Sequence, residues 1–129
     1  MSSTRRAAGA APAWMLIDVA GARFALAIDA VGEVLPVPEL APVPMTPDWM
    51  AGIADVRGEV VPVVDVGLRL RREPASRAGR IVLTRPDESG ERVGLIVDAI
   101  AGLVEQGADP GAPHLDVAAL LDPAVDLSI

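Results

Sequence analysis

The chain contains no cysteine, no lysine and no tyrosine, and it has one histidine and one phenylalanine among its 129 residues. Without cysteine it can form no disulfide and no thiolate metal site, and a lone His114 excludes most histidine-based metal sites and catalytic dyads. Aromatic residues make up only 2% of the chain, so a hydrophobic core must be built from valine, leucine, isoleucine and alanine. The formal net charge of −7 argues against nucleic acid or an anionic membrane as a partner.

Long hydrophobic runs are also missing. No stretch approaches the roughly 18 apolar residues that a membrane span needs, and the first residues lack the apolar segment of a secretion signal. We therefore expect no membrane insertion and a cytoplasmic location. Residues 1–13 are small, polar or proline-containing and are expected to form a disordered tail before one domain over residues 14–129.

What the domain does have is a series of short segments rich in valine, isoleucine and leucine, bounded by glycine, proline and aspartate. Such segments are typical of strands in an all-β domain. They cover residues 14–21, 22–29, 51–56, 59–66, 80–86 and 92–100. The segment 36–50 holds five prolines, which predicts an extended connection with at most one helical turn, capped by Thr46.

Two internal similarities indicate a duplicated unit. "FALAIDAVGEVL" (24–35) aligns with "VGLIVDAIAGLV" (93–104) at an offset of 69 residues, and "VVDVGLRL" (63–70) aligns with "HLDVAALL" (114–121) at an offset of 51. The offsets differ by 18 residues, so the second copy lacks a counterpart of the proline-rich connection and of the "GIADVRG" segment. We expect two packed, SH3-like small β-barrels with intertwined ends, the first mainly at 22–70 and the second, with strands missing, mainly at 80–122.

Constellations that carry catalysis are scarce in this sequence. The aspartates stand mostly at strand ends, where aspartate caps turns, and no spacing favours an acid/base pair. Five of the eleven arginines lie in residues 69–80 and are expected on a solvated loop, with a phosphate- or RNA-binding patch as the alternative. We predict no catalytic residues, no metal site and no cofactor.

Arg57 is a charged residue between two apolar segments, at the point where the chain is expected to turn. In "ADVRGEVV" two apolar strands flank Arg57-Gly58, and Gly58 can adopt the positive φ that a tight turn requires. Arg57 could simply point into water from a hairpin. It could instead present a planar guanidinium beside an apolar surface, where it would bind a carboxylate such as Glu33 or a partner's carbonyl groups.

Taken together, residues 14–104 resemble the CheW-type chemotaxis coupling proteins, with a weaker similarity at residues 115–122. The matching pieces, in family-like order, are Val31-x-Glu33-Val34, the proline-rich link ending in "MTPDWMAGI", "DVRGEVVPVVDV", "RIVLTRP" and "RVGLIVDAIAGLV". The resemblance implies a non-enzymatic scaffold that couples chemoreceptors to a CheA-type histidine kinase. It implies that the receptor's cytoplasmic tip lies in a hydrophobic groove between the barrels and that the kinase's regulatory domain docks barrel to barrel.

The same resemblance implies partner-binding roles for five residues, namely Val31, Glu33, Val34, Arg57 and Gly58. The chain departs from the family after residue 104, where "EQGADPGAPH" (105–114) replaces a longer stretch. An incomplete second barrel could pair with another subunit, which makes a homo-oligomer a further expectation. The alternative to a coupling protein is a divergent regulator or competitor that binds only the kinase or only the receptor.

Overall fold

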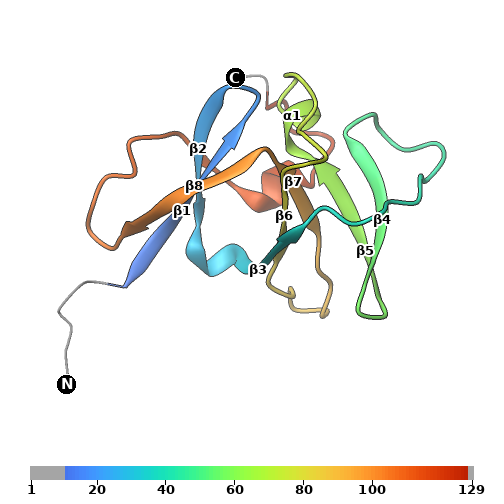
Figure 1. Ribbon diagram of the computed structural model, residues 1–129, viewed down its shortest axis with the longest axis horizontal. Coiled ribbons are helices and arrows are strands. Elements are labelled where there is room, and N and C mark those ends of the chain that lie inside the picture. Colours follow the sequence, from blue (N-terminus) through green and yellow to red (C-terminus); the bar gives the residue numbers. More distant parts are fainter. Residues whose placement is uncertain (1–10, 128–129) are drawn as a thin grey trace.

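The computed structural model describes residues 11–127, so residues 1–10 of the expected tail lie outside the described residues. Strands dominate and the helices are short, which confirms the all-β prediction (Figure 1). The elements are β1 (Pro12–Val19), β2 (Ala22–Ala27), η1 (Ile28–Ala30), β3 (Val31–Pro36), β4 (Met50–Val56), β5 (Glu59–Asp65), α1 (Val66–Arg69), β6 (Arg80–Thr84), β7 (Gly94–Val97), β8 (Ala99–Glu105), β9 (His114–Leu115) and α2 (Val117–Leu120).

The strands form two sheets whose members are interleaved along the chain. A four-stranded sheet has the order β8-β1-β2-β9, and a five-stranded sheet has the order β3-β6-β7-β5-β4. Figure 1 shows the first as the blue and orange strands and the second as the cyan, green and yellow strands. Sheet membership therefore cuts across the expected boundaries 22–70 and 80–122, because the chain passes from one sheet to the other twice, between β2 and β3 and between β7 and β8.

The first internal similarity corresponds to these two crossings. Strands β2 and β3 are equivalent to β7 and β8, and their partners are equivalent too. Val34 on β3 pairs with Val82 on β6, while its aligned counterpart Leu103 on β8 pairs with Met15 on β1. Each pairing also contains a register shift near the start of the repeated strand. On β3 it lies between Val31 and Glu33, and on β8 it lies between Ile100 and Gly102, opposite Leu16/Ile17 of β1. The duplication inferred from sequence is thus confirmed in strand register.

The second similarity corresponds to β5–α1 and β9–α2. Val64 on β5 pairs in parallel with Leu95 on β7, and its counterpart Leu115 on β9 pairs in parallel with Leu26 on β2. In each unit an aspartate follows the strand and caps a short helix: Asp65 accepts a hydrogen bond from the Leu68 amide and Asp116 from the Ala118 amide. The aspartate at a strand end is a helix cap in both copies, as its preference for such positions predicts.

One sheet closes on itself and the other does not. In the five-stranded sheet, Ala41, which follows β3, exchanges two backbone hydrogen bonds with Ile53 on β4, so that the first and last strands of the order are joined. In the four-stranded sheet, β4 has no counterpart, and β9 pairs only with β2 among residues 11–127. The predicted loss of strands from one copy is confirmed, and it leaves the edge of β9 open.

Two apolar clusters fill the fold. The larger includes Phe24, Leu26 and Leu95 and packs under both sheets, and the smaller, which includes Ile81 and Ile96, lies inside the five-stranded sheet. The core residues are aliphatic with the exception of Phe24, as the low aromatic content requires. Burial of many valine, leucine and isoleucine side chains supplies the main driving force for this fold.

Two details differ from the sequence expectations, namely the start of the first strand and the role of Thr46. Strand β1 begins at Pro12, inside the expected tail, because a proline is tolerated at the first residue of a strand. The segment before β4 forms turns without a helix, and the Thr46 hydroxyl donates to the carbonyl oxygen of Val43. No helix within residues 11–127 has the length and apolar character needed to cross a membrane.

Candidate functional site

The Arg57-Gly58 hairpin forms as the sequence predicts. Both central residues have positive φ, +52° for Arg57 and +88° for Gly58, which is the pattern of a type I′ turn, and the Asp55 carboxylate accepts from the Gly58 amide at 2.8 Å. Positive φ suits glycine and asparagine, and arginine adopts it only at a conformational cost. The arginine at this position is therefore not required by the turn itself.

Arg57 contacts Glu33, the partner proposed from the sequence. Its Nη2 donates to Glu33 Oε1 at 2.5 Å, with the two side chains 64% and 34% exposed. This hydrogen bond and the guanidinium charge hold the pKa of Glu33 below its ordinary value, and Glu33 raises the pKa of Arg57. Because Glu33 lies on β3 and Arg57 at the tip of the β4–β5 hairpin, the pair also joins the two ends of the five-stranded sheet.

The structure separates the remaining residues named from the sequence. Val31 is 8% exposed and belongs to the larger core cluster, and Val34 is half-buried against the same cluster. Gly58 lies exposed in the turn, where its positive φ is needed. Glu33, Arg57 and Gly58 therefore lie on the surface, while Val31 supports it from below.

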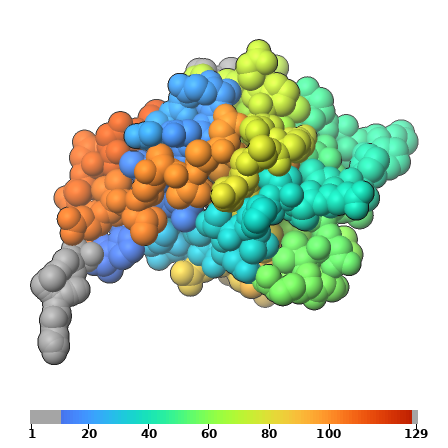
Figure 2. All heavy atoms as spheres, viewed as in Figure 1, coloured from blue at the N-terminus to red at the C-terminus, as the bar shows by residue number. Residues whose placement is uncertain are grey.

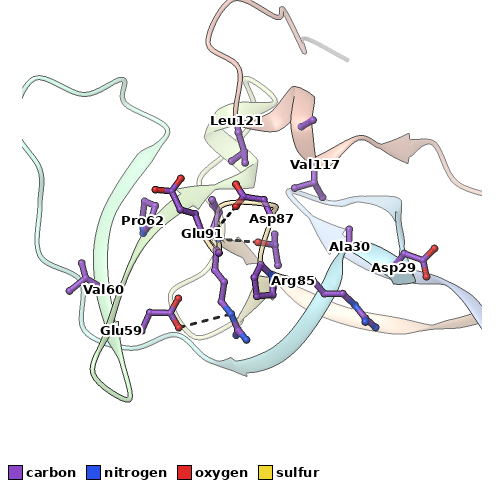
Figure 3. A pocket seen from close by; sticks show the side chains of 16 residues that line it. Asp29, Ala30, Glu59, Val60, Pro62, Arg85, Asp87, Glu91, Val117 and Leu121 are labelled. Carbon is purple, nitrogen blue, oxygen red and sulfur yellow. Dashed lines mark hydrogen bonds and ion pairs between the residues drawn. The ribbon is translucent and has the colours of Figure 1, made fainter.

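A cavity of about 750 Å³ opens between the two sheets, close to this hairpin (Figure 3). Val60 and Pro62 of β5 line one side of it. Val117 and Leu121 come from α2, the helix that follows β9 of the other sheet, and from the residue after it. Val60 is 65% exposed and Leu121 36%, so both present apolar surface to solvent at the cavity. We call this cavity the inter-sheet groove.

Charged side chains surround the apolar surface of the inter-sheet groove. Four carboxylates and two guanidinium groups line it, those of Asp29, Glu59, Asp87, Glu91, Arg85 and Arg92. Glu59 follows the Arg57-Gly58 turn directly, and its Oε1 lies 4.0 Å from Nε of Arg92. Backbone amides of the 87–91 turn, that of Glu91 first, lower the pKa of Asp87. An apolar surface with a charged rim suits a protein segment better than a small apolar ligand.

Two of the five arginines in residues 69–80 bind groups within the fold, and one of them, Arg69, is buried and not on a solvated loop as expected. Arg69 is 5% exposed, and its guanidinium donates to the carbonyl oxygens of Ala119, Leu120, Asp122 and Val125. A cation at this place caps the carboxyl end of α2. Arg77 binds the buried carboxylate of Asp65 at 2.9 Å. These two arginines serve the fold.

Sequence reasoning also missed part of the groove. His114 lies at the start of β9, outside the groove, over the ring of Trp14 with centroids 4.0 Å apart. Within residues 11–127, no cluster of three or more histidine, aspartate or glutamate residues could hold a metal ion. Val60 and Leu121 were not identified, because a single exposed apolar residue in a strand-like segment has no distinguishing pattern. Side chains alternate between the two faces of a strand, so counting along β5 from the Arg57-Gly58 turn could have placed Val60 on the outer face of the sheet.

Fold and site together define a small all-β domain that consists of a duplicated strand unit with a charged-rim groove between its two sheets. Residues 13–125 match the CheW-like domain family, and the chain belongs to this family.

Individual relatives agree with this assignment. A probable chemotaxis protein CheW of Rhizobium etli is 31% identical over 81 residues, which cover 63% of this chain and 52% of that protein. The chemotaxis protein CheW of Rhizobium meliloti is 30% identical over 95 residues, covering 74% and 61%. The crystal structure of the scaffolding protein TtCheW from Thermoanaerobacter tengcongensis superposes with a TM-score of 0.65 at 28% identity, covering 74% of this chain and 65% of that one. The chain thus spans between half and two thirds of the length of these relatives.

Proposed function

We propose that this protein is a non-enzymatic adaptor of bacterial chemosensory signalling that couples a chemoreceptor to a CheA-type histidine kinase in the cytoplasm. Membership in the CheW-like family supports an adaptor role. The observation that carries the proposal is the inter-sheet groove, which presents exposed Val60 and Leu121 within a rim of charged residues. Such a surface fits an amphipathic helical segment, as at the tip of a receptor hairpin.

The Glu33–Arg57 pair has a place in this proposal. Arg57 is exposed and Glu33 partly exposed, and the hairpin that carries Arg57 continues directly into Glu59 and Val60 of the groove. Arg57 uses Nη2 on Glu33, which leaves other donors of its planar fork for the backbone or side-chain oxygens of a docked partner. We assign Arg57, Glu33 and Gly58 to partner binding and Val31 and Val34 to support of that surface.

The test is a binding titration of the full chain against two partners from the same organism, a receptor-tip fragment and the kinase's regulatory domain. Val60→Asp places a charge in the groove and should weaken binding of the receptor tip about tenfold or more, since an unpaired carboxylate would be buried in the complex. Met45→Asp is the matched control, because Met45 is fully exposed, lies outside the groove and has positive φ, which aspartate tolerates.

The outcomes separate the proposal from its alternative. Binding of both partners, with the receptor contact sensitive to Val60→Asp and not to Met45→Asp, supports a coupling protein. Binding of one partner alone supports the divergent regulator or competitor. Binding of neither, by a chain that remains folded, contradicts both.

A further inference from the structure

The open edge of β9 is the strongest feature that the proposed function does not use. In the other sheet, β5 occupies the place equivalent to β9, and β4 pairs along its outer edge. The equivalent edge of β9 has no such strand within residues 11–127. We propose that the β9 edge receives an extended segment from a partner protein, which pairs antiparallel with residues 112–116 and completes the four-stranded sheet as β4 completes the five-stranded one.

The equivalence of β5 and β9 extends to single backbone groups. The alignment of 63–70 with 114–121 continues backwards to Pro62 and Pro113 at the same offset. In a two-residue hairpin the pair next to the turn, here Val56 and Glu59, is hydrogen-bonded, and every second pair along the strands is hydrogen-bonded too. The pair Gly52–Val63 is therefore hydrogen-bonded. Pro62 belongs to the non-hydrogen-bonded pair before it, where its missing N–H costs no hydrogen bond to β4. On β9, His114 therefore stands where Val63 stands on β5.

The pairing of β9 with β2 leaves the backbone of His114 available on the other side. The Ala25 amide donates to the carbonyl oxygen of Pro113, at 2.8 Å, and Ala25 is the register partner of His114. In a parallel pair of strands, Ala25 forms its hydrogen bonds with the residues before and after His114, not with His114 itself. The N–H and C=O of His114 therefore point towards the open edge. An incoming strand would place the residue equivalent to Gly52 opposite His114.

Charge argues for a partner of a different kind from this chain. Residues 93–129 contain six carboxylates and no arginine or lysine. Two copies joined edge to edge would bring Asp109 and Asp116 of each copy close to those of the other, which is unfavourable. The strand that fills the equivalent edge, β4, is apolar apart from Asp55. Leu103, 58% exposed, lies on β8 at the opposite edge of the four-stranded sheet and is no part of this site; Figure 2 shows the orange residues of β8 at the surface of the molecule. The occupant should therefore be an apolar extended segment with neutral or basic ends.

The probe for this site is a synthetic peptide with the sequence of residues 49–57, capped at both ends, because β4 is the strand that fits the equivalent edge. We expect the full chain to bind it and to show amide shifts at residues 112–116. His114→Pro removes the donor at the open edge and keeps the neighbouring hydrogen bonds to β2, and it should weaken peptide binding about tenfold or more. His114→Ala, which loses the ring over Trp14 and keeps the amide, is the matched control and should bind as the wild type does.

Two further arms keep the test decisive. A peptide with sarcosine in place of Gly52 lacks the N–H that faces His114 and should bind as weakly as wild-type peptide binds His114→Pro, whether or not that variant folds. A peptide with Asp55→Arg should bind more tightly at low salt. The proposal is overturned by absence of peptide binding, by equal binding to His114→Pro and His114→Ala, or by shifts confined to β4 and β5. A homodimer that His114→Pro abolishes would overturn the choice of a foreign partner.

Discussion

The two sheets begin from the same repeated unit and end as different structures. Strands β1–β2 and β6–β7 form equivalent pairs, and β9–α2 repeats β5–α1, but only the five-stranded sheet has a β4 and the hairpin that follows it. That hairpin closes the sheet through Ile53 and Arg57 and supplies Val60 to the groove. On the other sheet the position equivalent to Glu33 is Gly102, and no hairpin faces it. Closure of the sheet and the candidate binding site thus depend on the same segment, the one that the other unit lacks.

The largest expected effect concerns the side chain that joins the two units. Arg69 extends from α1, stacks over Trp49 with its guanidinium carbon 5.0 Å from the ring centre, and donates to four carbonyl groups at the end of α2. Arg69→Ala should lower the free energy of unfolding by about 3 kcal/mol, since several partly buried hydrogen bonds to a charged group are lost together. Urea unfolding followed by circular dichroism measures this.

Arg71 provides the control for Arg69. It is two residues away and largely exposed, with an ion pair to Asp126 at 3.6 Å. Arg71→Ala should change the free energy of unfolding by about 0.5 kcal/mol or less. Similar losses for the two variants would contradict the view that Arg69 links the repeated units.

The next effect compares the two capping aspartates. Asp65 is completely buried and accepts from the amides of Leu68 and Ala75 as well as from Arg77. Asp116, at the equivalent position, is exposed and caps only its own helix. Asp65→Ala should cost about 2 kcal/mol of unfolding free energy, because buried donors lose their acceptor, and Asp116→Ala about 1 kcal/mol or less. Equal costs in denaturant titrations would mean that the two units are energetically alike.

These comparisons show how far the sequence alone could lead. The internal similarities predicted the duplicated unit and the missing strand, because strand register preserves residue offsets along the chain. The Glu33–Arg57 pair was foreseen as one of two uses for Arg57. The roles of Arg69 and Arg77 were not foreseen. An arginine in a polar segment has the same appearance in sequence whether it faces water, donates to a backbone 51 residues away as Arg69 does, or binds a buried carboxylate as Arg77 does.

Substitution of Arg57 at the tip of the β4–β5 hairpin should have little effect on stability and a larger effect on partner binding. Arg57→Asn supplies a residue that a type I′ turn favours, so the melting temperature should stay the same or rise. Binding of the receptor-tip fragment should fall about tenfold, since a charge-assisted donor is lost. Arg23→Asn is the control: Arg23 pairs with Asp18 at 2.7 Å within the β1–β2 hairpin, outside the groove, and its loss should leave binding unchanged. A cooperative loss of structure in Arg57→Asn would assign Arg57 to the fold instead.

The smallest effect is the pH dependence of these two ion pairs. Arg57 lowers the pKa of Glu33 from its ordinary value of 4.5, and Arg23 lowers that of Asp18 from 3.8, in each case chiefly through the side-chain hydrogen bond. A carboxylate whose pKa is lower in the folded state contributes stability above its unfolded pKa, and the contribution is lost as the pH falls through the folded pKa. Acidification should therefore begin to weaken the Glu33 pair below about pH 4.5 and the Asp18 pair only below about pH 3.8. Carboxyl NMR titrations should show the Glu33 pKa rising towards its ordinary value in Arg57→Asn alone, and the Asp18 pKa in Arg23→Asn alone. If either substitution moved both pKa values, the closure of the five-stranded sheet and the β1–β2 hairpin would not be independent.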